Sequence, residues 1–362
     1  MTPTQSKATL MVMAGGTGGH VYPAIAVADY LYAQGWKIVW LATEGGMENR
    51  LIADKPYAKA MITMRGVRGK GLLGWLLLPF KLLLAFKQSL SAIKQYQPNV
   101  VLGMGGFAAF PGGLMAKVLG KPLVIHEQNS VAGLTNTILS HVANQVLAAF
   151  PAAFGGRAML VGNPVRDELT QLPLPPTRYA NRTGKLKVLV VGGSLGAAAL
   201  NAVLPKALAT LPEAQRPEVV HQAGEKMIAT LEANYRQADV SADTRAYIQD
   251  MAVQYAWADV VICRSGALTV AELACVGVAS VLVPFPYAVD DHQTTNAQYL
   301  SDKGAAILIQ QTAFSVENAS EILNQLTREH CLVMANKARG LAKPEATLSV
   351  AKACMTLAGI IE

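Results

Sequence analysis

The chain has 362 residues, of which 52% are hydrophobic, with four cysteines and a formal net charge of +7. This length exceeds the size at which one hydrophobic core usually keeps growing, so we expect two domains. The cysteines have no CxxC spacing, which argues against a zinc site or a disulfide framework. The apolar run near the N-terminus is too short for a signal peptide, and we expect a reduced, cytoplasmic protein.

A strand-to-loop signature appears twice along the chain. An apolar run at 10–14 leads into the glycines of 15–19, and a second run at 188–191 leads into the glycines of 192–196. Each is followed by an Ala-rich helical pattern, which is typical of the start of a parallel α/β domain. The sequence therefore predicts two similar halves with a cleft between them.

Further short apolar runs alternate with helical patterns in both halves. This alternation implies parallel sheets with right-handed crossovers, so each half is predicted to be a doubly wound, Rossmann-like α/β domain. Ligands of such sheets bind beyond the carboxyl ends of the strands. The additional predicted strands are 37–41, 100–102, 123–125, 146–148, 219–220, 260–262 and 280–283.

A proline-rich stretch at 164–187 suits an irregular linker between the halves. We therefore expect an N-terminal domain at 1–165 and a C-terminal domain at 166–344. A last helical pattern, at about 345–362, could pack back on the first domain or on the second.

Positive charge is concentrated between Asp54 and Glu127, where ten Lys and Arg residues occur without any acidic residue. The Leu-rich stretch 72–86 lies within this segment and is interrupted by Pro79 and Lys81. A bilayer-spanning helix needs roughly 20 apolar residues, so the stretch is too short and too broken to cross a membrane.

The same stretch fits a patch in the membrane interface, where lysines meet anionic lipid. Trp75, Leu76 and Phe80 are the expected membrane contacts. The alternative is a buried helix whose lysines form its solvated side. Nucleic acid is a less suitable partner, because no recognised nucleic-acid module is present and aliphatic side chains would not contact phosphates.

The first glycine loop lacks the third glycine of G-x-G-x-x-G, and no G-K-[ST] follows any glycine run. Nicotinamide binding and a P-loop are therefore poorly supported. A turn at a helix N-terminus remains, where free amides can approach an anion or a sugar. His20 stands at the start of that helix, which disfavours the imidazolium and suits a general base. A structural histidine is the alternative.

A second anion site is predicted where the strand at 260–263 ends in Arg264-Ser265-Gly266 and a helix begins. The amides of that helix could hold a diphosphate, and Glu272 lies within reach of a ribose diol. A favourable charge near a helix N-terminus is the alternative for Glu272. No D-x-D triplet occurs. Asp290-Asp291-His292 could mimic a metal-ligand cluster, but adjacent carboxylates are more typical of a solvated or sugar-binding loop, so we expect no metal and no cofactor.

Seven motifs together resemble the MurG family of bacterial glycosyltransferases, which add N-acetylglucosamine to lipid I. The resemblance runs in order from about residue 10 to residue 300. The motifs are 15–24, 103–107, 126–129, 162–166, 192–196, 264–272 and 291–297.

This resemblance implies a GT-B fold that binds the nucleotide sugar mainly with its second half and the lipid-linked acceptor with its first. It implies inverting transfer from UDP-N-acetylglucosamine to the 4-hydroxyl of the muramyl pentapeptide of lipid I, which gives lipid II for peptidoglycan. The protein would be peripheral on the cytoplasmic face of the inner membrane, with anionic lipid and wall-synthesis proteins as candidate partners. A different GT-B enzyme and a non-catalytic nucleotide- or lipid-binding protein are the competing hypotheses.

The resemblance also implies roles for individual residues. His20 is the first candidate for the base, with His126 or Glu127 as alternatives. The loop at 17–19 would lie near the sugar and phosphates, and the segment 267–272 would meet the diphosphate and ribose. The implied substrate-binding residues are Thr17, Gly18, Gly19, Asn129 (sugar), Arg166 and Ser194 (nucleotide), Ile248 (uracil), Ala267, Leu268, Thr269, Val270, Ala271, Glu272 and Gln293 (sugar hydroxyls).

Overall fold

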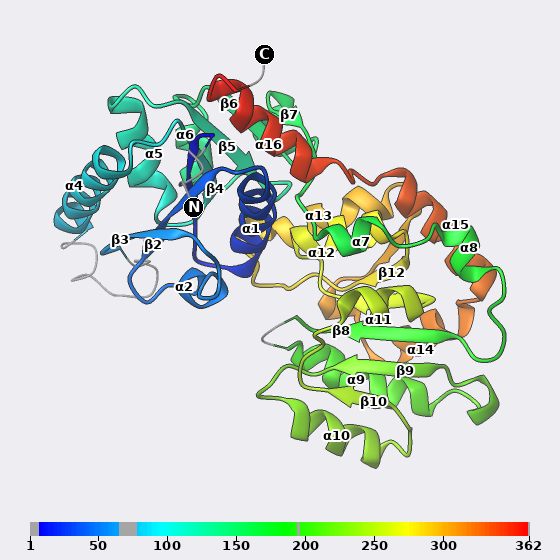
Figure 1. Cartoon of the computed structure of the whole chain (residues 1–362). Helices are drawn as coiled ribbons and strands as arrows, with labels where there is room; N and C mark the ends of the chain where they lie inside the picture. The colour runs from blue at the N-terminus through cyan, green and yellow to red at the C-terminus, as the bar shows by residue number, and fades with distance from the viewer. Residues whose placement is uncertain (1–6, 65–77, 194–195, 361–362) are drawn as a thin grey trace. The chain divides into compact units, whose positions relative to one another are not determined.

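The computed structural model describes residues 7–64, 78–193 and 196–360 (Figure 1). The chain divides into two compact units, which we call unit 1 (Met1–Val165 and Pro344–Glu362) and unit 2 (Arg166–Lys343). The predicted membrane contacts Trp75 and Leu76, and the predicted nucleotide contact Ser194, lie outside the described residues.

Unit 1 contains a seven-stranded parallel sheet in the order β3-β2-β1-β4-β5-β6-β7. Its strands are β1 (Thr9–Ala14), β2 (Lys37–Thr43), β3 (Ala58–Ile62), β4 (Val100–Gly105), β5 (Leu123–Glu127), β6 (Gln145–Ala148) and β7 (Met159–Leu160). Its helices are α1 (Gly18–Ala33), α2 (Glu48–Leu51), α4 (Leu78–Tyr96), α5 (Ala109–Val118), α6 (Leu134–Leu139) and α16 (Ala346–Leu357), with a 3-10 turn η1 (Ala153–Gly156).

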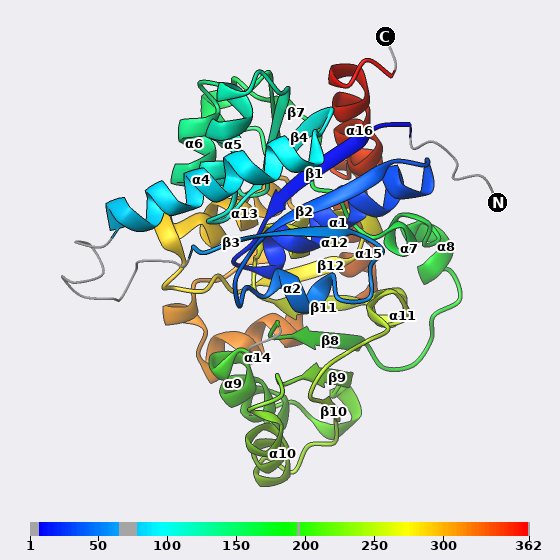
Figure 2. The same cartoon turned by 60° about the vertical axis from the view of Figure 1, so that its left-hand side comes forward.

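Alternation along β1 explains why helices cover both faces of this sheet. Leu10 and Val12 belong to a core that includes residues of α1 and α16, whereas Met11 and Met13 belong to a second core with residues of α4 and α5. Successive strand residues point to opposite faces, and a parallel strand buried on both faces has a continuous apolar sequence. The last helix, α16, packs against α1 and β4, so it belongs to unit 1 (Figures 1 and 2).

Unit 2 contains a six-stranded parallel sheet in the order β10-β9-β8-β11-β12-β13. Its strands are β8 (Lys187–Val191), β9 (Glu218–Gln222), β10 (Asp243–Arg245), β11 (Val260–Cys263), β12 (Ala279–Leu282) and β13 (Ala306–Leu308). Its helices are α7 (Asp167–Thr170), α8 (Pro175–Tyr179), α9 (Ala198–Ala209), α10 (Ile228–Gln237), α11 (Met251–Trp257), α12 (Ala267–Val276), α13 (His292–Ser301), α14 (Val316–Gln325) and α15 (Arg328–Gly340), with 3-10 turns η2 (Glu213–Gln215), η3 (Val289–Asp291) and η4 (Gln311–Ala313).

Both sheets have the strand order of a doubly wound nucleotide-binding fold. The order reverses between β1 and β4 in unit 1, and between β8 and β11 in unit 2. Such a reversal opens a crevice at the carboxyl ends of the two strands, where ligands of this fold bind. The predicted α/β fold class is confirmed, and every predicted strand overlaps an observed one, although the strand predicted at 280–283 extends one residue beyond β12. Strands β3, β7, β10 and β13 were not predicted.

The prediction of an irregular linker over the whole of 164–187 is wrong. This segment contains α7 and α8, and it is bound to unit 2 through Asp259, whose side chain is fully buried. Arg182 forms an ion pair with this carboxylate, and the Tyr179 hydroxyl donates to the Asp259 carbonyl. The Lys187 amide donates to Asp259 Oδ2 over 2.9 Å. A buried carboxylate needs such partners, which fix the segment to unit 2.

No helix in the described parts of the chain is both long and apolar enough to cross a membrane.

Candidate active site

The first glycine loop lies between β1 and α1, on one side of the strand-order reversal in unit 1. Thr17 precedes the helix in an extended conformation, and the His20 amide donates to its carbonyl over 3.1 Å. Gly18 and Gly19 open α1, so their amides are among those that a helix leaves without intrahelical acceptors. The predicted loop residues are thus at a helix N-terminus, where an anion or sugar oxygen can be bound.

A second glycine loop, at the end of β4, packs closely on the first. Gly105 and Gly106 have φ values of +96° and +88°, which favour glycine. A Cβ on Gly106 would lie 2.3 Å from the Gly15 carbonyl oxygen, and one on Gly105 would lie 3.1 Å from His20 Cε1. Only glycine permits this approach, and the approach holds the His20 ring against β4.

The His20 side chain is half-buried, and its Nδ1 lies 2.7 Å from Gln128 Oε1. Gln128 follows β5 and is only 1% exposed. Sequence pattern alone does not single out Gln128, since its contact with His20 joins residues 108 positions apart. The carboxyl ends of β1, β4 and β5 therefore meet around the imidazole.

The Glu127 carboxylate is buried and accepts four hydrogen bonds from the loop that follows it and from the start of α6. Oε1 accepts from the amide and from the side chain of Asn129, over 3.0 and 3.3 Å. Oε2 accepts from the Gly133 amide over 3.1 Å and from Asn136 Nδ2 over 2.9 Å. A carboxylate with this many donors is suited to organising the loop that carries Asn129, and poorly suited to taking a proton from a substrate.

His126, the other alternative base, is fully buried. Its Nε2 lies 2.9 Å from the Gly162 carbonyl oxygen, and its Nδ1 lies 3.1 Å from Gln128 Nε2. Burial lowers the pKa of His126 to about 4. Both ring nitrogens are used inside the protein, which argues against His126 as the base.

In unit 2, the predicted diphosphate site lies where β11 meets α12. Gly266 caps the helix in an extended conformation, and Ala267, Leu268 and Thr269 form its first turn. Of the remaining predicted helix residues, Val270 is buried and Ala271 is half-buried. The free amides of this turn can hold an anion.

Ser265 connects this turn to the predicted sugar-binding residue Gln293. The Ser265 hydroxyl donates to the Gln293 carbonyl over 2.8 Å, and Asn296 Nδ2 donates to the Ser265 carbonyl over 3.3 Å. The Gln293 side chain accepts from the Phe285 amide over 2.9 Å through Oε1. The start of α13 is thereby held beside the start of α12.

Glu272 and Arg166, predicted separately, lie together in unit 2. Glu272 Oε1 lies 3.5 Å from Arg166 Nη2, and Oε2 accepts from the Tyr255 hydroxyl over 3.1 Å. Burial raises the pKa of Glu272, while Arg166 and Tyr255 oppose that effect. Arg166 also pairs with Glu168 over 3.1 Å. Tyr255 was not predicted, because nothing in its helix distinguishes it from a core tyrosine.

The glycine loop of unit 2 follows β8 and is equally constrained. A Cβ on Gly192 would lie 2.7 Å from the Ala197 amide nitrogen, and one on Gly196 would lie 2.1 Å from the Ala223 carbonyl oxygen. Ile248, the predicted uracil contact, follows β10 and is 2% exposed. A base placed there would reach the main chain of Ile248 more readily than its side chain.

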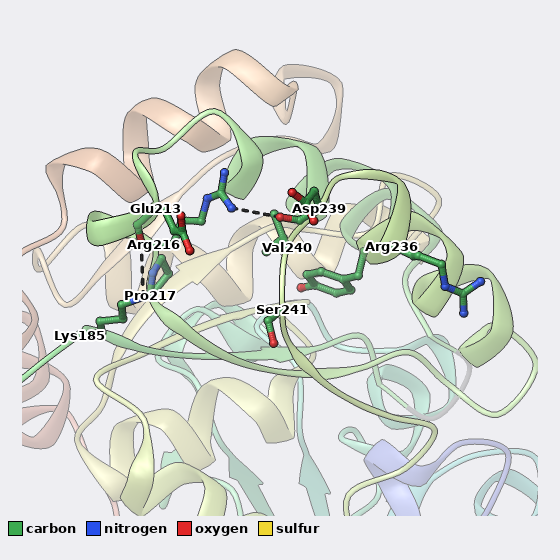
Figure 3. A pocket seen from close by; sticks show the side chains of 9 residues that line it. Lys185, Glu213, Arg216, Pro217, Arg236, Asp239, Val240 and Ser241 are labelled. Carbon is green, nitrogen blue, oxygen red and sulfur yellow. Dashed lines mark hydrogen bonds between the residues drawn. The ribbon is translucent and has the colours of Figure 1, made fainter.

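A pocket of about 560 Å³ also occurs in unit 2 (Figure 3). It is lined by Lys185, Pro217 and Ser241, which come shortly before β8, β9 and β10, so it lies at the amino ends of these strands. Two of its three cations are used within the fold: Lys185 donates to the Glu213 carbonyl over 3.4 Å, and Arg216 donates to the Asp239 carbonyl over 3.0 Å. Ligands of doubly wound sheets bind at the opposite edge.

Acidic residues at η3 do not gather into a metal-binding cluster. Across residues 7–64, 78–193 and 196–360, no group of three or more His, Cys, Asp or Glu side chains is placed to hold an ion. The Asp291 carboxylate accepts instead from the side-chain hydroxyl of Thr294, over 2.7 Å.

Comparison with known proteins agrees with this fold. The glycosyltransferase family 28 N-terminal domain matches residues 10–148, and the family 28 C-terminal domain matches residues 187–352. The crystal structure of Acinetobacter baumannii MurG superposes with a TM-score of 0.86 at 42% identity, covering 96% of this chain and 99% of that one. CalG4, the calicheamicin glycosyltransferase, shares the fold at 14% identity and a TM-score of 0.67. The match covers 98% of this chain and 99% of that one.

Two curated relatives are similar along nearly their whole length. Both are named UDP-N-acetylglucosamine–N-acetylmuramyl-(pentapeptide) pyrophosphoryl-undecaprenol N-acetylglucosamine transferase. The protein from Nitrosospira multiformis is 54% identical, over 97% of this chain and 99% of its own length. The protein from Cupriavidus metallidurans is 58% identical, over 97% of this chain and 98% of its own length. The resemblance inferred from the motifs is confirmed, and the chain belongs to the MurG group of glycosyltransferase family 28.

Proposed function

We propose that this chain transfers N-acetylglucosamine from UDP-N-acetylglucosamine to N-acetylmuramyl-(pentapeptide) pyrophosphoryl-undecaprenol, which is lipid I, and so makes lipid II for peptidoglycan. The observation that carries the proposal is identity of more than half along nearly the full length of relatives named for this reaction. The placement of His20 and of the start of α12, each beside a strand-order reversal, supports it from the geometry.

The reaction is a single displacement with His20 as the base. The 4-hydroxyl oxygen of the muramyl residue bonds to the anomeric carbon, and the bond from that carbon to the diphosphate oxygen breaks. UDP leaves with the electron pair, and the hydroxyl proton passes to the His20 imidazole. Attack opposite the leaving group inverts the α-linkage to β. His20 suits this role because its half-buried ring stands at the start of α1, beside the loop proposed to bind the sugar.

Unit 2 supplies most of the donor site. The amides that open α12, at Ala267, Leu268 and Thr269, stabilise the leaving diphosphate, since a helix N-terminus favours developing negative charge. Glu272 accepts from the ribose hydroxyls while Tyr255 and Arg166 hold its carboxylate. The remaining implied contacts of this unit are Ser194, Ile248, Val270, Ala271 and Gln293.

In unit 1, the proposed contacts of the transferred sugar are the loop of Thr17, Gly18 and Gly19, and Asn129. We propose that no resident metal is needed, because helix amides can neutralise the diphosphate and no D-x-D motif is present. Transfer that continues at its full rate in excess EDTA would support this, and a requirement for a divalent cation would contradict it.

We also propose that unit 1 docks on the anionic cytoplasmic leaflet, where the lipid-linked acceptor resides. On α4, the apolar side chains of Phe80 and Leu83 are 72% and 69% exposed, whereas Ala85 and Ile93 are buried. Exposed apolar side chains beside Lys81 and Lys87 are typical of a helix lying in a membrane interface.

Liposome co-sedimentation tests the docking surface. Changing Phe80 and Leu83 to Ser should weaken binding to anionic vesicles, and further changes of Trp75 and Leu76 to Ser should weaken it more. Val118→Ser is a matched control, because Val118 is 69% exposed on α5 of the same unit. Unchanged binding by a folded Phe80→Ser/Leu83→Ser variant would refute docking through α4.

The activity itself is tested by offering the wild type radiolabelled UDP-N-acetylglucosamine with a lipid I analogue. Labelled lipid II is the expected product. Transfer only to a different lipid or natural-product acceptor would favour another enzyme of this fold. Donor binding without transfer to any acceptor would favour a non-catalytic binding protein.

A further inference from the structure

A chain of hydrogen bonds connects His20 to the interior of unit 1. His20 Nδ1 lies 2.7 Å from Gln128 Oε1, and Gln128 Nε2 lies 3.1 Å from His126 Nδ1. His126 Nε2 then lies 2.9 Å from the Gly162 carbonyl oxygen. The chain therefore runs from the start of α1, through two side chains at the end of β5, to a main-chain carbonyl after β7.

Two main-chain carbonyls fix the direction of every bond in this chain. A carbonyl oxygen can only accept, so Nε2 of His126 donates to Gly162. Burial keeps His126 neutral by lowering its pKa to about 4, and its Nδ1 is therefore an acceptor. Gln128 Nε2 donates both to this Nδ1 and to the His126 carbonyl, each over 3.1 Å. The amide oxygen of Gln128 is consequently the atom that faces His20.

An acceptor opposite His20 Nδ1 determines where the neutral imidazole carries its proton. Oε1 of Gln128 accepts from Nδ1–H, which leaves Nε2 of His20 with a lone pair. A flipped Gln128 amide would place its oxygen against two acceptors, the Nδ1 and the carbonyl of His126, in a buried site. Such unpaired contacts are costly, so the orientation is specified.

We propose that Gln128 is a positioning residue that selects the base-competent tautomer of His20, and that His126 holds the Gln128 amide in its orientation. This rests on the proposed function, in which His20 takes the proton of the acceptor hydroxyl. The proton arrives at Nε2, and the resulting imidazolium keeps its Nδ1–H bond to Gln128. No proton moves along the chain, because the Gln128 amide only orients the ring.

The surroundings of Gln128 restrict it to this role. Its side chain is 1% exposed, and Asn163 Nδ2 donates to its main-chain carbonyl over 3.0 Å. Its Nε2 also approaches Met104 Sδ at 3.9 Å. Substrate is therefore expected to contact His20, with Gln128 acting behind it.

Nitrogen-15 NMR of histidine-labelled wild-type protein tests the tautomer without any assay of activity. Protonated and unprotonated ring nitrogens of neutral imidazole have well-separated shifts. Among the six histidines, the signals of His20 and His126 can be identified by subtracting the His20→Ala and His126→Asn spectra. Neutral His20 should carry its proton on Nδ1, and His126 should carry its proton on Nε2. A His20 proton on Nε2 would overturn the proposal, whether or not the protein transfers sugar.

Substitutions then test the consequence for catalysis. Gln128→Met removes the acceptor, so we expect His20 to populate the Nε2–H tautomer and kcat to fall about 10- to 100-fold, with the KM for UDP-N-acetylglucosamine changed less than about twofold. His126→Asn should retain the wild-type His20 tautomer, because the Asn Oδ1 can replace Nδ1 as an acceptor. Gln88→Met is the matched control, since Gln88 is a half-buried glutamine of α4 that bonds only to Thr63 among the described contacts.

A double variant separates action through His20 from a general structural effect. In a His20→Ala background, Gln128→Met should cause no further loss of kcat, because residues that act as one unit are not additive. A full additional loss, an unchanged His20 tautomer in Gln128→Met, or an unchanged kcat would each overturn the proposal. Failure of the proposed function would instead appear as absence of transfer by the wild type, with the wild-type spectrum as expected.

Discussion

Replacing Gly106 by alanine should destabilise unit 1 and disturb its catalytic loop together. The φ of +88° costs an alanine about 1–2 kcal/mol. Its Cβ would lie 2.3 Å from the Gly15 carbonyl oxygen, and moving two main-chain segments apart costs about 1–3 kcal/mol more. The total is about 2–5 kcal/mol, which for a unit of this size corresponds to a fall in Tm of about 10 °C.

The matched control is Gly103→Ala in β4, the strand that leads into Gly106. A Cβ on Gly103 would meet Ile125 Cγ2 at 3.4 Å and Met13 Cε at 3.5 Å, which are ordinary contacts, so its stability should change by less than about 1 kcal/mol. Thermal unfolding can be followed by tryptophan fluorescence in a Trp257→Phe background, because the other three tryptophans belong to unit 1. Equal Tm values for Gly106→Ala and Gly103→Ala would refute the close packing of the two loops.

Three further predictions concern the donor site and the buried polar groups. Glu272→Gln should weaken binding of UDP-N-acetylglucosamine by about 10- to 100-fold in calorimetry, because a charged hydrogen-bond acceptor is lost. Tyr255→Phe should weaken binding less. Wild-type affinity in Glu272→Gln would contradict the proposed ribose contact. The unfolded chain protonates His126 below about pH 6.5, and native unit 1 protonates it only below about pH 4. His126 should therefore lower the free energy of unfolding of unit 1 by about 3 kcal/mol as pH drops through this window, and His126→Asn should remove this contribution in urea titrations; His221 contributes separately in unit 2. Asp259→Ala should destabilise unit 2 by about 3–5 kcal/mol in calorimetric unfolding, because Arg182 loses its buried partner. A loss of stability below about 1 kcal/mol would show that the ion pair is dispensable.

The sequence allowed prediction of those features that depend on local pattern. The run Leu10–Ala14 followed by glycines predicts a buried strand and a helix N-terminus, and both are present at β1 and α1. His20 could be placed at the start of that helix for the same reason. The glycine loop of unit 2 after β8 and the start of α12 after β11 could be predicted from the same kind of local pattern. The strand order places both at the point where the order of the sheet reverses, between β8 and β11.

Contacts between distant residues could not be predicted in this way. The bond from Gln128 to His20 depends on the register of β5 beside β4, and the bond from Tyr255 to Glu272 joins two helices. The short strands β7 and β10 have two and three residues, too few for a periodic signal. Proline-rich sequence at 164–187 indicated a linker, but the pairing of Arg182 with Asp259 overrides that local tendency.

Transfer of radiolabelled N-acetylglucosamine to a lipid I analogue, compared between the wild type and His20→Ala, tests the central claim most directly. The wild type should form lipid II, and His20→Ala should lose about 10²- to 10⁴-fold in kcat while still binding UDP-N-acetylglucosamine, because general-base catalysis is lost and the donor site in unit 2 is retained. A folded His20→Ala variant that transfers the sugar at the wild-type rate would contradict the account.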